Sequence, residues 1–366
     1  MKATVQWIIS ALIALIILAV CVGGGLYFTR IKSIRSIRKL TDYETYNLYR
    51  MNIDYDYDLD RVIGRGVGDN QAMIDAILAE SLPYLPIHMK APNFGCSAFC
   101  TQSTDAHTLM GRNYDFKNDT SAMLVYCTPK DGYASVAFAA LDNVSANQPE
   151  QSMAKKLAAL TAPFICLDGM NEKGVSIAVL TLDSEPTSQN TGKPTIFTTL
   201  AIRLVLDRAA TTQEAVDLLG QYDMFATSGR DYHFYITDAS GDGRVVEYDC
   251  NSPERTMTVT PTRSVTNFFV MYQDEVLPNQ KNGVYGHGRE RYDAIEEILD
   301  ANAGSITREI AWQALQAASQ APNPQDVTSN TQWSILYDNT ALTAEIVIRR
   351  DWDTTTNYRL TDNKIV

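Results

Sequence analysis

The sequence predicts an α+β fold in which antiparallel sheets are covered by helices that come in pairs. The first observation behind this prediction is a series of short strand patterns joined by hairpin turns, one turn at Met170–Gly174 and one at Asp238–Gly243. The second is the position of the helical patterns, which occur as two pairs inserted between strands. With 45% hydrophobic and 20% charged residues, a chain of 366 residues can bury the core that such layers need.

Each element follows from a local pattern. Residues 51–60 alternate apolar and polar side chains, which predicts a half-buried strand, and Asp69-Asn70 caps a helix that follows. Thr211 and Glu214 form a capping box at the start of one helix. The expected strands from Gly95 onward include Thr108–Phe116, Ala122–Thr128, Ala134–Leu141 and, closing the chain, Trp333–Tyr337 and Ala344–Arg349. The expected helices are Thr195–Ala210, a helix that begins at Thr211, Arg289–Ala301 and Ser305–Ser319.

The N-terminal region contains an uncharged apolar run, Trp7–Phe28. At about 1.5 Å per residue this run can cross a hydrocarbon core of roughly 30 Å, which predicts a single transmembrane anchor. A signal peptide or a lipoprotein signal that ends at Cys21 is the alternative. Five basic residues follow the run and only Lys2 precedes it. The positive-inside rule therefore favours a cytoplasmic location for the rest of the chain, which we call the body. The same basic stretch also fits an amphipathic stem.

Charge and motif content exclude several classes of protein. The first 40 residues carry +6 of the net charge of −12, which leaves −18 on the rest and argues against nucleic-acid binding. The six cysteines form no CxxC pair, and Leu59 and Arg65 occupy the positions where an EF-hand loop needs Gly and Glu, so no metal site is expected. No GxSxG, Walker, HExxH or GxGxxG motif occurs, and no cofactor is expected.

One short segment can carry nucleophilic chemistry. If the bond between Gly95 and Cys96 is cut, Cys96 gains a free α-amine with a pKa near 7.7–8, which can act as the base for its own thiol. Arg112 would lie on the next strand, where its charge favours the thiolate, and Asp115 could hold the ammonium group. The simpler interpretation of Cys96 is a small buried core residue, and this is how we interpret Cys100, which follows Phe99 instead of Gly.

These residues resemble the start of the choloylglycine hydrolase family, in which a cysteine is followed sixteen residues later by the Arg of a Gly-Arg-Asn-x-Asp-Phe motif. The family comprises bile salt hydrolases, penicillin V acylases and related linear-amide hydrolases. Further segments resemble family motifs in the same order, over residues 95–340: Asp168–Val175, His233–Glu247, Val265–Asn267, Gly288-Arg289 and Thr331–Ser334. The resemblance implies the Ntn-hydrolase αββα fold, two antiparallel sheets between helix layers, with Cys96 as nucleophile beside Arg112 and Asp115. It also implies that Asn171 donates to the oxyanion and that Arg289 is a second active-site arginine.

The resemblance implies a function as well, with two departures. Gly229 stands where many members have Asn, and 95 residues precede Cys96. We expect a membrane anchor and basic stem at 1–40, a prosegment-like region at 41–95 and the hydrolase domain at 96–366. The expected activity is hydrolysis of a small-molecule N-acyl amide through a thioester on Cys96. The alternatives are an acyltransferase or lipid amidase on the same fold, or a catalytically silent, membrane-tethered binding domain. The resemblance favours a body outside the cytoplasm, against the basic flank.

Overall fold

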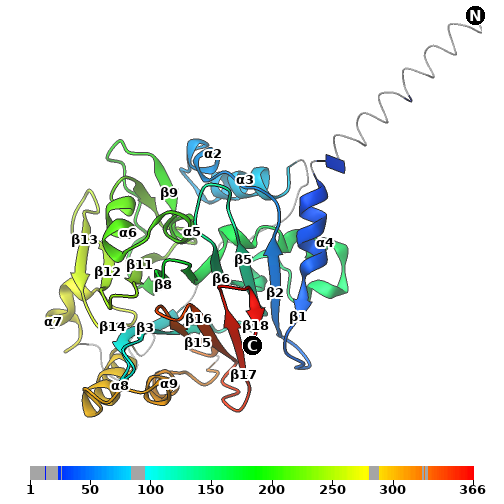
Figure 1. Cartoon of the computed structure of the whole chain (residues 1–366). Coiled ribbons are helices and arrows are strands. Elements are labelled where there is room, and N and C mark those ends of the chain that lie inside the picture. The colour runs from blue at the N-terminus through cyan, green and yellow to red at the C-terminus, as the bar shows by residue number, and fades with distance from the viewer. Residues whose placement is uncertain are drawn as a thin grey trace, which may run out of the picture.

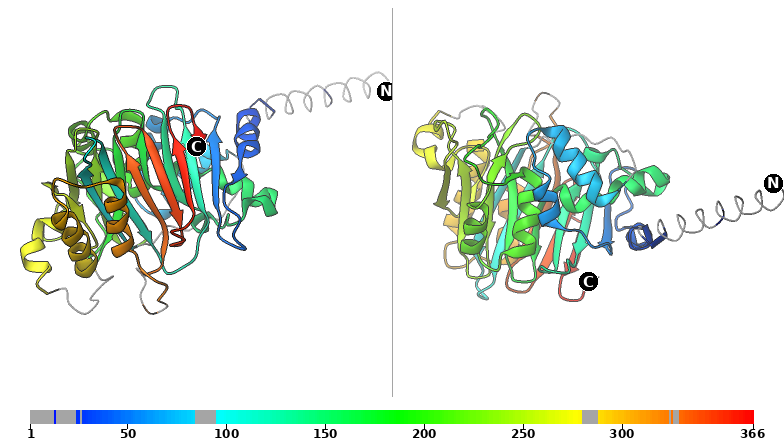
Figure 2. Two further views of the ribbon diagram at one scale, coloured as in Figure 1. Left: turned by 60° about the horizontal axis from the view of Figure 1, so that its bottom comes forward. Right: turned by 90° about the horizontal axis from the view of Figure 1, so that it is seen from above.

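Two β-sheets lie face to face, and helices cover the outer face of each (Figure 1, Figure 2). The computed structural model describes residues 13, 24–25, 27–83, 95–279, 288–323, 325 and 329–366. The two sheets meet through buried side chains, such as Phe138 and Tyr337, whose ring centroids are 6.3 Å apart in an edge-to-face contact. The predicted α+β sandwich of two sheets between helix layers is therefore confirmed.

The larger sheet has nine strands in the order β1-β2-β5-β6-β7-β8-β11-β12-β13. Its neighbouring strands are antiparallel except for β2 and β5, which are parallel, so the prediction of wholly antiparallel sheets is wrong at this pair. Parallel strands need a long crossover connection, and residues 54–121 between these two strands supply it. The nine strands are β1 Arg38–Lys39, β2 Leu48–Ile53, β5 Ala122–Cys127, β6 Ser135–Ala140, β7 Cys166–Asn171, β8 Ser176–Leu182, β11 Asp231–Thr237, β12 Gly243–Tyr248 and β13 Met257–Pro261.

The second sheet has seven antiparallel strands in the order β14-β3-β4-β15-β16-β17-β18. Its strands are β14 Ser264–Val265, β3 Gly95–Gln102, β4 Thr108–Asp115, β15 Thr331–Asp338, β16 Thr343–Ile348, β17 Thr355–Arg359 and β18 Lys364–Ile365. The expectation that β16 closes the chain is wrong, because β17 and β18 follow it. Tyr358 is the one fully buried side chain of β17, so this strand lacks the apolar alternation that identifies a strand in a sequence.

The helices occur on the outer faces in the expected pairs. Helices α5 (Thr198–Arg208) and α6 (Thr212–Leu219) cover the nine-stranded sheet, and α8 (Gly288–Ala301) and α9 (Arg308–Ala317) cover β3 and β4 of the other. The first three residues of the expected helix Thr195–Ala210 instead form strand β9 (Thr195–Phe197), which pairs with β10 (Asp223–Phe225). Further α-helices are α2 Leu59–Gly64, α3 Asn70–Ser81, α4 Met153–Ala159 and α7 Gln273–Val276, and residues 27–36 are helical as well. The 3-10 helices among the described residues are Leu141–Val144, Pro149–Gln151, Ala162–Phe164 and Val270–Tyr272.

The predicted helix caps are confirmed. The Thr211 hydroxyl accepts a hydrogen bond from the Glu214 N–H at 3.1 Å, and Glu214 reaches back to the N–H of Ala210 at 2.8 Å. Asp69 accepts from the N–H of Ala72 at 2.8 Å and begins α3.

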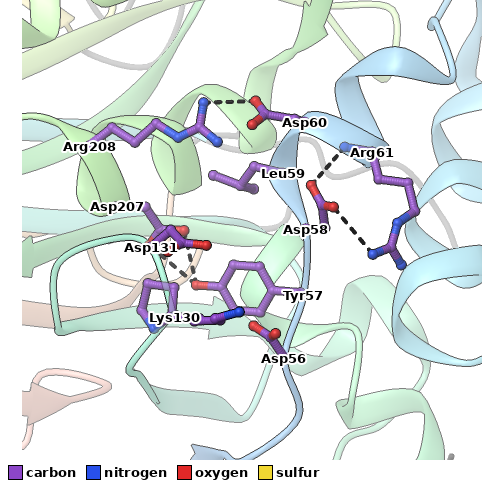
Figure 3. Close-up of a pocket in the computed structure, with 11 residues that line it drawn as sticks. Asp56, Tyr57, Asp58, Leu59, Asp60, Arg61, Lys130, Asp131, Asp207 and Arg208 are labelled. Carbon is purple, nitrogen blue, oxygen red and sulfur yellow. Dashed lines mark hydrogen bonds and ion pairs between the residues drawn. The ribbon is translucent and has the colours of Figure 1, made fainter.

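The region that precedes Cys96 is packed into the domain. The strand expected over residues 51–60 starts earlier and ends at Ile53, because the chain bends at Tyr55 and residues 59–60 begin helix α2. The side chains of Tyr55 and Tyr57 are buried between the two elements. Tyr57 donates to the carboxylate of Asp207 at 3.0 Å, and Asp60 pairs with Arg208 at 2.8 Å beside a cavity of about 290 Å³ (Figure 3). The predicted division of the chain at residue 95 therefore concerns processing, since Tyr57 and Asp60 are bonded to residues of the domain that follows.

Most of the apolar run at residues 7–28 lies outside the described residues. Within the described part of the chain, no helix is long and apolar enough to cross a bilayer.

Candidate active site

Cys96 and Arg112 lie on the inner face of the seven-stranded sheet. Cys96 is the second residue of β3 and pairs across the ladder with Tyr114 of β4, and Ala98 pairs with Arg112. Paired residues share a face of a sheet, and so do alternate residues along a strand, so Cys96, Arg112 and Tyr114 all point toward the other sheet. Position 111 requires glycine, because a Cβ there would overlap the ring of Phe99, which packs on the face of the sheet opposite to Cys96. In the Gly111-Arg112 pair the glycine is thus needed for packing, and the arginine places a charge near the thiol.

Arg112 is held rigidly although it is completely buried. Its Nη2 donates to the carbonyl of Val179 on β8 at 2.9 Å, and its Nε lies 3.4 Å from the carboxylate of Asp168 on β7. Asp168 in turn accepts from Tyr337 at 2.5 Å and from the Trp333 indole at 3.2 Å. A buried guanidinium in this network carries a fixed positive charge into the space between the sheets.

Burial disfavours the thiolate of Cys96 in the uncut chain. Burial raises the pKa of Cys96 to about 11, and the charge and hydrogen bond of Arg112 oppose that rise. The exposed fraction of Cys96 is 0%, and its nitrogen is an amide in the Gly95–Cys96 peptide bond. The thiolate that a nucleophile requires is therefore not favoured until solvent or a nearby base reaches the sulfur.

Asp115 and Arg291 meet on the other face of the sheet. Arg291 of α8 lies 3.1 Å from the carboxylate of Asp115 and donates to the carbonyl oxygen of Cys96. Thr331 donates to Asp115 at 2.6 Å, and Gln320 lies 3.4 Å away. Burial raises the pKa of Asp115, while Arg291 and the hydroxyl of Thr331 oppose the rise. This ion pair holds the backbone of Cys96 from the side opposite to its thiol.

Asn267 joins the nitrogen of Cys96 to the same cluster. Its Oδ1 accepts the Cys96 N–H at 3.2 Å and a hydrogen bond from Arg291, and its Nδ2 donates to the carbonyl of Thr181 at 2.7 Å. Asn267 follows β14, whose two residues pair with β3. The structure places Cys96, Arg112 and Asp115 on the paired strands β3 and β4, with the Asp115 side chain on the face opposite to the thiol, and adds Asn267 and Arg291 to them. The roles expected of the three predicted residues stay predictions.

Arg291, and not the predicted Arg289, contacts the residues around Cys96. Arg289 pairs with Asp293 at 3.2 Å and its side chain is 36% exposed, whereas the side chain of Arg291 is 4% exposed. Two residues turn an α-helix by about 200°, so the two arginines point to opposite sides of α8. The sequence contains the signal that separates them, because Arg291 stands four and eight residues before the buried Ile295 and Leu299.

The assignment of Asn171 as an oxyanion donor is not supported by its position. Side chains alternate along β7, so that Asp168 points to the inner face and Asn171 to the outer face, where α5 packs. Its Nδ2 donates to the carbonyls of Leu206 and Ala209 at 3.0 and 2.8 Å, and its Oδ1 accepts from the N–H groups of Lys173 and Val175. Both ends of the amide are used by the hairpin and the end of the helix, which makes Asn171 a structural residue.

Cys100 lies four residues further along β3, where its sulfur accepts a hydrogen bond from the hydroxyl of Thr237 at 3.0 Å. Burial raises its pKa to about 11, with no arginine among the causes that oppose the rise. Among the described residues, no group of three or more His, Cys, Asp or Glu side chains is arranged to hold a metal ion.

Comparison with known proteins supports this description of the fold. The sequence profile of the acyl-coenzyme A:6-aminopenicillanic acid acyl-transferase family matches residues 101–351. No curated protein sequence matches the chain.

Solved structures with a similar fold include penicillin V acylase from Agrobacterium tumefaciens, with 18% identity, a TM-score of 0.54, and coverage of 73% of this chain and 86% of that one. Two mutants of conjugated bile acid hydrolase from Clostridium perfringens are also similar. One has 14% identity and a TM-score of 0.55, and the match covers 74% of this chain and 95% of that one. The other has 13% identity and a TM-score of 0.56, and the match covers 74% of this chain and 96% of that one. The expected resemblance to choloylglycine hydrolases is therefore confirmed at the level of the fold.

Proposed function

The chain belongs to the acyl-coenzyme A:6-aminopenicillanic acid acyl-transferase family, and from this premise we propose that it hydrolyses a linear N-acyl amide with Cys96 as the nucleophile. One observation carries the proposal. The nitrogen of Cys96 lies against Asn267 at 3.2 Å, while its sulfur shares the inner face with Arg112. A cut between Gly95 and Cys96 would place a free amine and a thiol of the same residue between these two groups.

The reaction follows from that placement. The α-amine of Cys96 takes the thiol proton, and Arg112 stabilises the thiolate that remains. The thiolate attacks the substrate carbonyl and forms a tetrahedral adduct. The carbon–nitrogen bond then breaks, and the leaving amine takes the proton from the Cys96 ammonium, which leaves a thioester. A water molecule gives a proton to the α-amine and attacks the thioester, so that the acid leaves and the thiol is restored.

Acyl transfer is the second candidate, and the name of the family favours it. An amine that replaces water at the thioester would give a new amide instead of the free acid. Adding a primary amine to the reaction separates the two, because transfer gives a second amide at the expense of the acid.

The proposed substrate is neutral or weakly charged. The body beyond residue 40 carries a charge of −18, which repels anions. The two arginines that could offset this repulsion are already engaged, Arg230 with Asp183 at 3.6 Å and Arg289 with Asp293 at 3.2 Å. N-acyl amides of varied chain length are therefore expected to react faster than glycocholate or penicillin V.

The proposed location is a membrane, with residues 7–28 as the anchor and the body outside the cytoplasm. The anchor is proposed from the apolar run in the sequence, and the placement outside the cytoplasm from the resemblance to the family, against the basic residues that follow the run. Fractionation of cells followed by protease treatment of intact cells tests it. A body that stays protected in intact cells would place it in the cytoplasm.

The decisive experiment for the activity combines intact mass, N-terminal sequencing and a substrate panel. We expect a fragment that begins with Cys96, and release of free acid from N-acyl amides by the cleaved protein. Active protein whose chain still runs through Gly95–Cys96 would contradict the mechanism. A chain that is never cut and releases no acid would instead support a silent binding domain.

A further inference from the structure

A buried pair of hydrogen-bonded side chains, His233 and Glu247, lies next to the site and is not used by the reaction. His233 on β11 and Glu247 on β12 are both 0% exposed, and the distance from Nδ1 to Oε1 is 2.8 Å. We propose that this pair is a positioning device, which holds the segment Thr266–Met271 and thereby Asn267 in the active site. The catalytic part of this inference rests on the function proposed above.

The hydrogen bonds show how the pair is attached to the backbone of the segment Thr266–Met271. His233 Nε2 lies 3.1 Å from the carbonyl oxygen of Thr266, and a carbonyl only accepts, so Nε2 carries a hydrogen. The oxygens of Glu247 accept from the N–H groups of Val270 and Met271 at 2.8 and 2.9 Å. His233 therefore donates from Nε2 to the backbone, while Nδ1 shares a hydrogen bond with Oε1 of Glu247.

These contacts hold the segment at both ends. His233 binds it at Thr266, and Glu247 binds it at Val270 and Met271. Asn267 lies between these two points of attachment, where its Oδ1 accepts the N–H of Cys96. The pair itself does not touch Cys96, so it acts through the backbone that carries Asn267.

The same segment also positions α8. The Thr266 hydroxyl donates to the carbonyl of Gly288 at 2.6 Å, and Gly288 is the first residue of the helix that carries Arg291. Phe268 packs edge to face against Tyr292, with ring centroids 5.3 Å apart. One buried pair therefore fixes both side chains that hold the backbone of Cys96.

A purely structural role would not need two buried polar side chains. Burying them costs the desolvation of both groups, and apolar side chains of the same size often stabilise a fold equally well. A misplacement of about 1 Å at a reacting group can lower a rate about 100-fold, so accurate placement of Asn267 gives this pair a function that apolar residues would not supply.

Two substitutions separate the two hydrogen bonds of His233. The amide of His233→Gln places a donor near Nε2 and keeps the contact with Thr266, whereas that of His233→Asn places a donor near Nδ1 and keeps only the contact with Glu247. His107→Gln is the matched control, because His107 also pairs with a buried carboxylate, Asp338, at 2.7 Å, at the end of β4 far from Asp115.

Hydrogen exchange of the full-length chain gives a readout that needs no activity. In His233→Asn we expect exchange of peptides that span residues 264–271 and 288–296 to be at least 10-fold faster, with a smaller effect in His233→Gln and none in His107→Gln. Unchanged exchange in His233→Asn would overturn the inference. If the wild-type chain releases no acid from N-acyl amides, the proposed function fails, and this measurement still decides whether the pair holds the segment.

Kinetics give the second readout. We expect kcat of His233→Asn to fall at least 10-fold with KM changed less than threefold, and His233→Gln to keep the larger share of kcat. A kcat in His233→Asn equal to or above that of His233→Gln would overturn the inference, as would a loss confined to KM.

Discussion

The carbonyl oxygen of Cys96 accepts a hydrogen bond from the guanidinium of Arg291, which stands 195 residues later in the chain. The same guanidinium lies 3.1 Å from the carboxylate of Asp115, on the strand next to Cys96. The candidate nucleophile is thus held through its main chain, by a helix from the layer outside the sheet, while its thiol points to the inside.

Arg291→Gln is expected to lose most activity, and Arg289→Gln to keep it. The substitution leaves Asp115 buried without its cation, and removing one partner of a buried charged pair costs roughly 2–5 kcal/mol. Arg289 pairs with Asp293 on the surface, where such pairs contribute about 0–1 kcal/mol. The two substitutions lie on the same helix, and rates of acid release and thermal melts compare the two variants. Equal activities would contradict the prediction and show that Arg291 is only structural.

Cys96→Ala is expected to abolish cleavage of the chain and turnover, while Cys100→Ala leaves both largely intact. The two thiols lie four residues apart on β3 and are both buried, but Arg112 acts on the sulfur of Cys96 and Thr237 on that of Cys100. Intact mass and acid release test this for each variant. Turnover by Cys96→Ala would exclude it as the nucleophile.

Arg112→Gln is expected to lower kcat/KM by about 100-fold or more, and Asp168→Asn by a smaller factor. The charge of Arg112 opposes the raised pKa of the Cys96 thiol on the same face of the sheet, whereas Asp168 acts on the thiol only through this guanidinium, 3.4 Å from it. Both substitutions keep the approximate size of the side chain, so the fold is expected to survive. Circular dichroism serves as the control, and a larger loss in Asp168→Asn than in Arg112→Gln would reverse this order of roles.

Stability is expected to fall between about pH 9 and pH 11. Burial raises the pKa of Cys96, Cys100 and Cys127 from an ordinary value of 9.0 to about 11 each. In this range the unfolded chain releases thiol protons that the folded chain keeps, so the free energy of unfolding decreases as the pH rises. The contribution is on the order of 2 kcal/mol per thiol and is fully present below pH 9.

Urea denaturation of wild type and Cys127→Ala across this pH range measures the effect. Cys127 lies on β5, away from Arg112, and the difference between the two proteins removes the contribution of tyrosines that titrate in the same range. A constant difference between pH 7 and pH 11 would contradict the raised pKa.

The segment before Cys96 is expected to stay bound after a cut at residue 95. Leu48 and Met51 of β2 are completely buried, and Tyr57 and Asp60 bond to Asp207 and Arg208 of the body (Figure 3). The cleaved protein should therefore elute as one species in native gel filtration and as two chains under denaturing conditions. Release of the short chain in native buffer would show that β2 contributes little.

Those parts of the site that depend on local sequence pattern could be predicted from the sequence alone. The spacing from Cys96 to Arg112 and Asp115 spans one hairpin, so the pairing of β3 with β4 brings them together. The hairpin turn of Asn171 was also recognised correctly, but the face of β7 to which Asn171 points depends on the packing of α5 on that sheet. A sequence motif does not state which face a helix will cover.

The contacts of Asn267 and Gln320 were harder to predict because they join distant parts of the chain. Asn267 stood in a segment that resembled a family motif, yet its role depends on how β14 pairs with β3. Gln320 carries no signal in the sequence, since it follows α9 in a loop and reaches Asp115 only through the fold. Arg291 could have been found, because it shares the apolar stripe of its helix.

The parallel pairing of β2 with β5 makes the larger sheet depend on the region that precedes the nucleophile. Without residues 38–53, strand β5 would become an edge, with the N–H and C=O groups of Ala122–Cys127 open on one side. Its sequence, Ala-Met-Leu-Val-Tyr-Cys, is apolar and uncharged, the composition that promotes edge-to-edge association between molecules. A gene shortened to begin at Cys96 would therefore produce a protein prone to aggregation, so the enzyme should be expressed with its leading segment and cut afterwards.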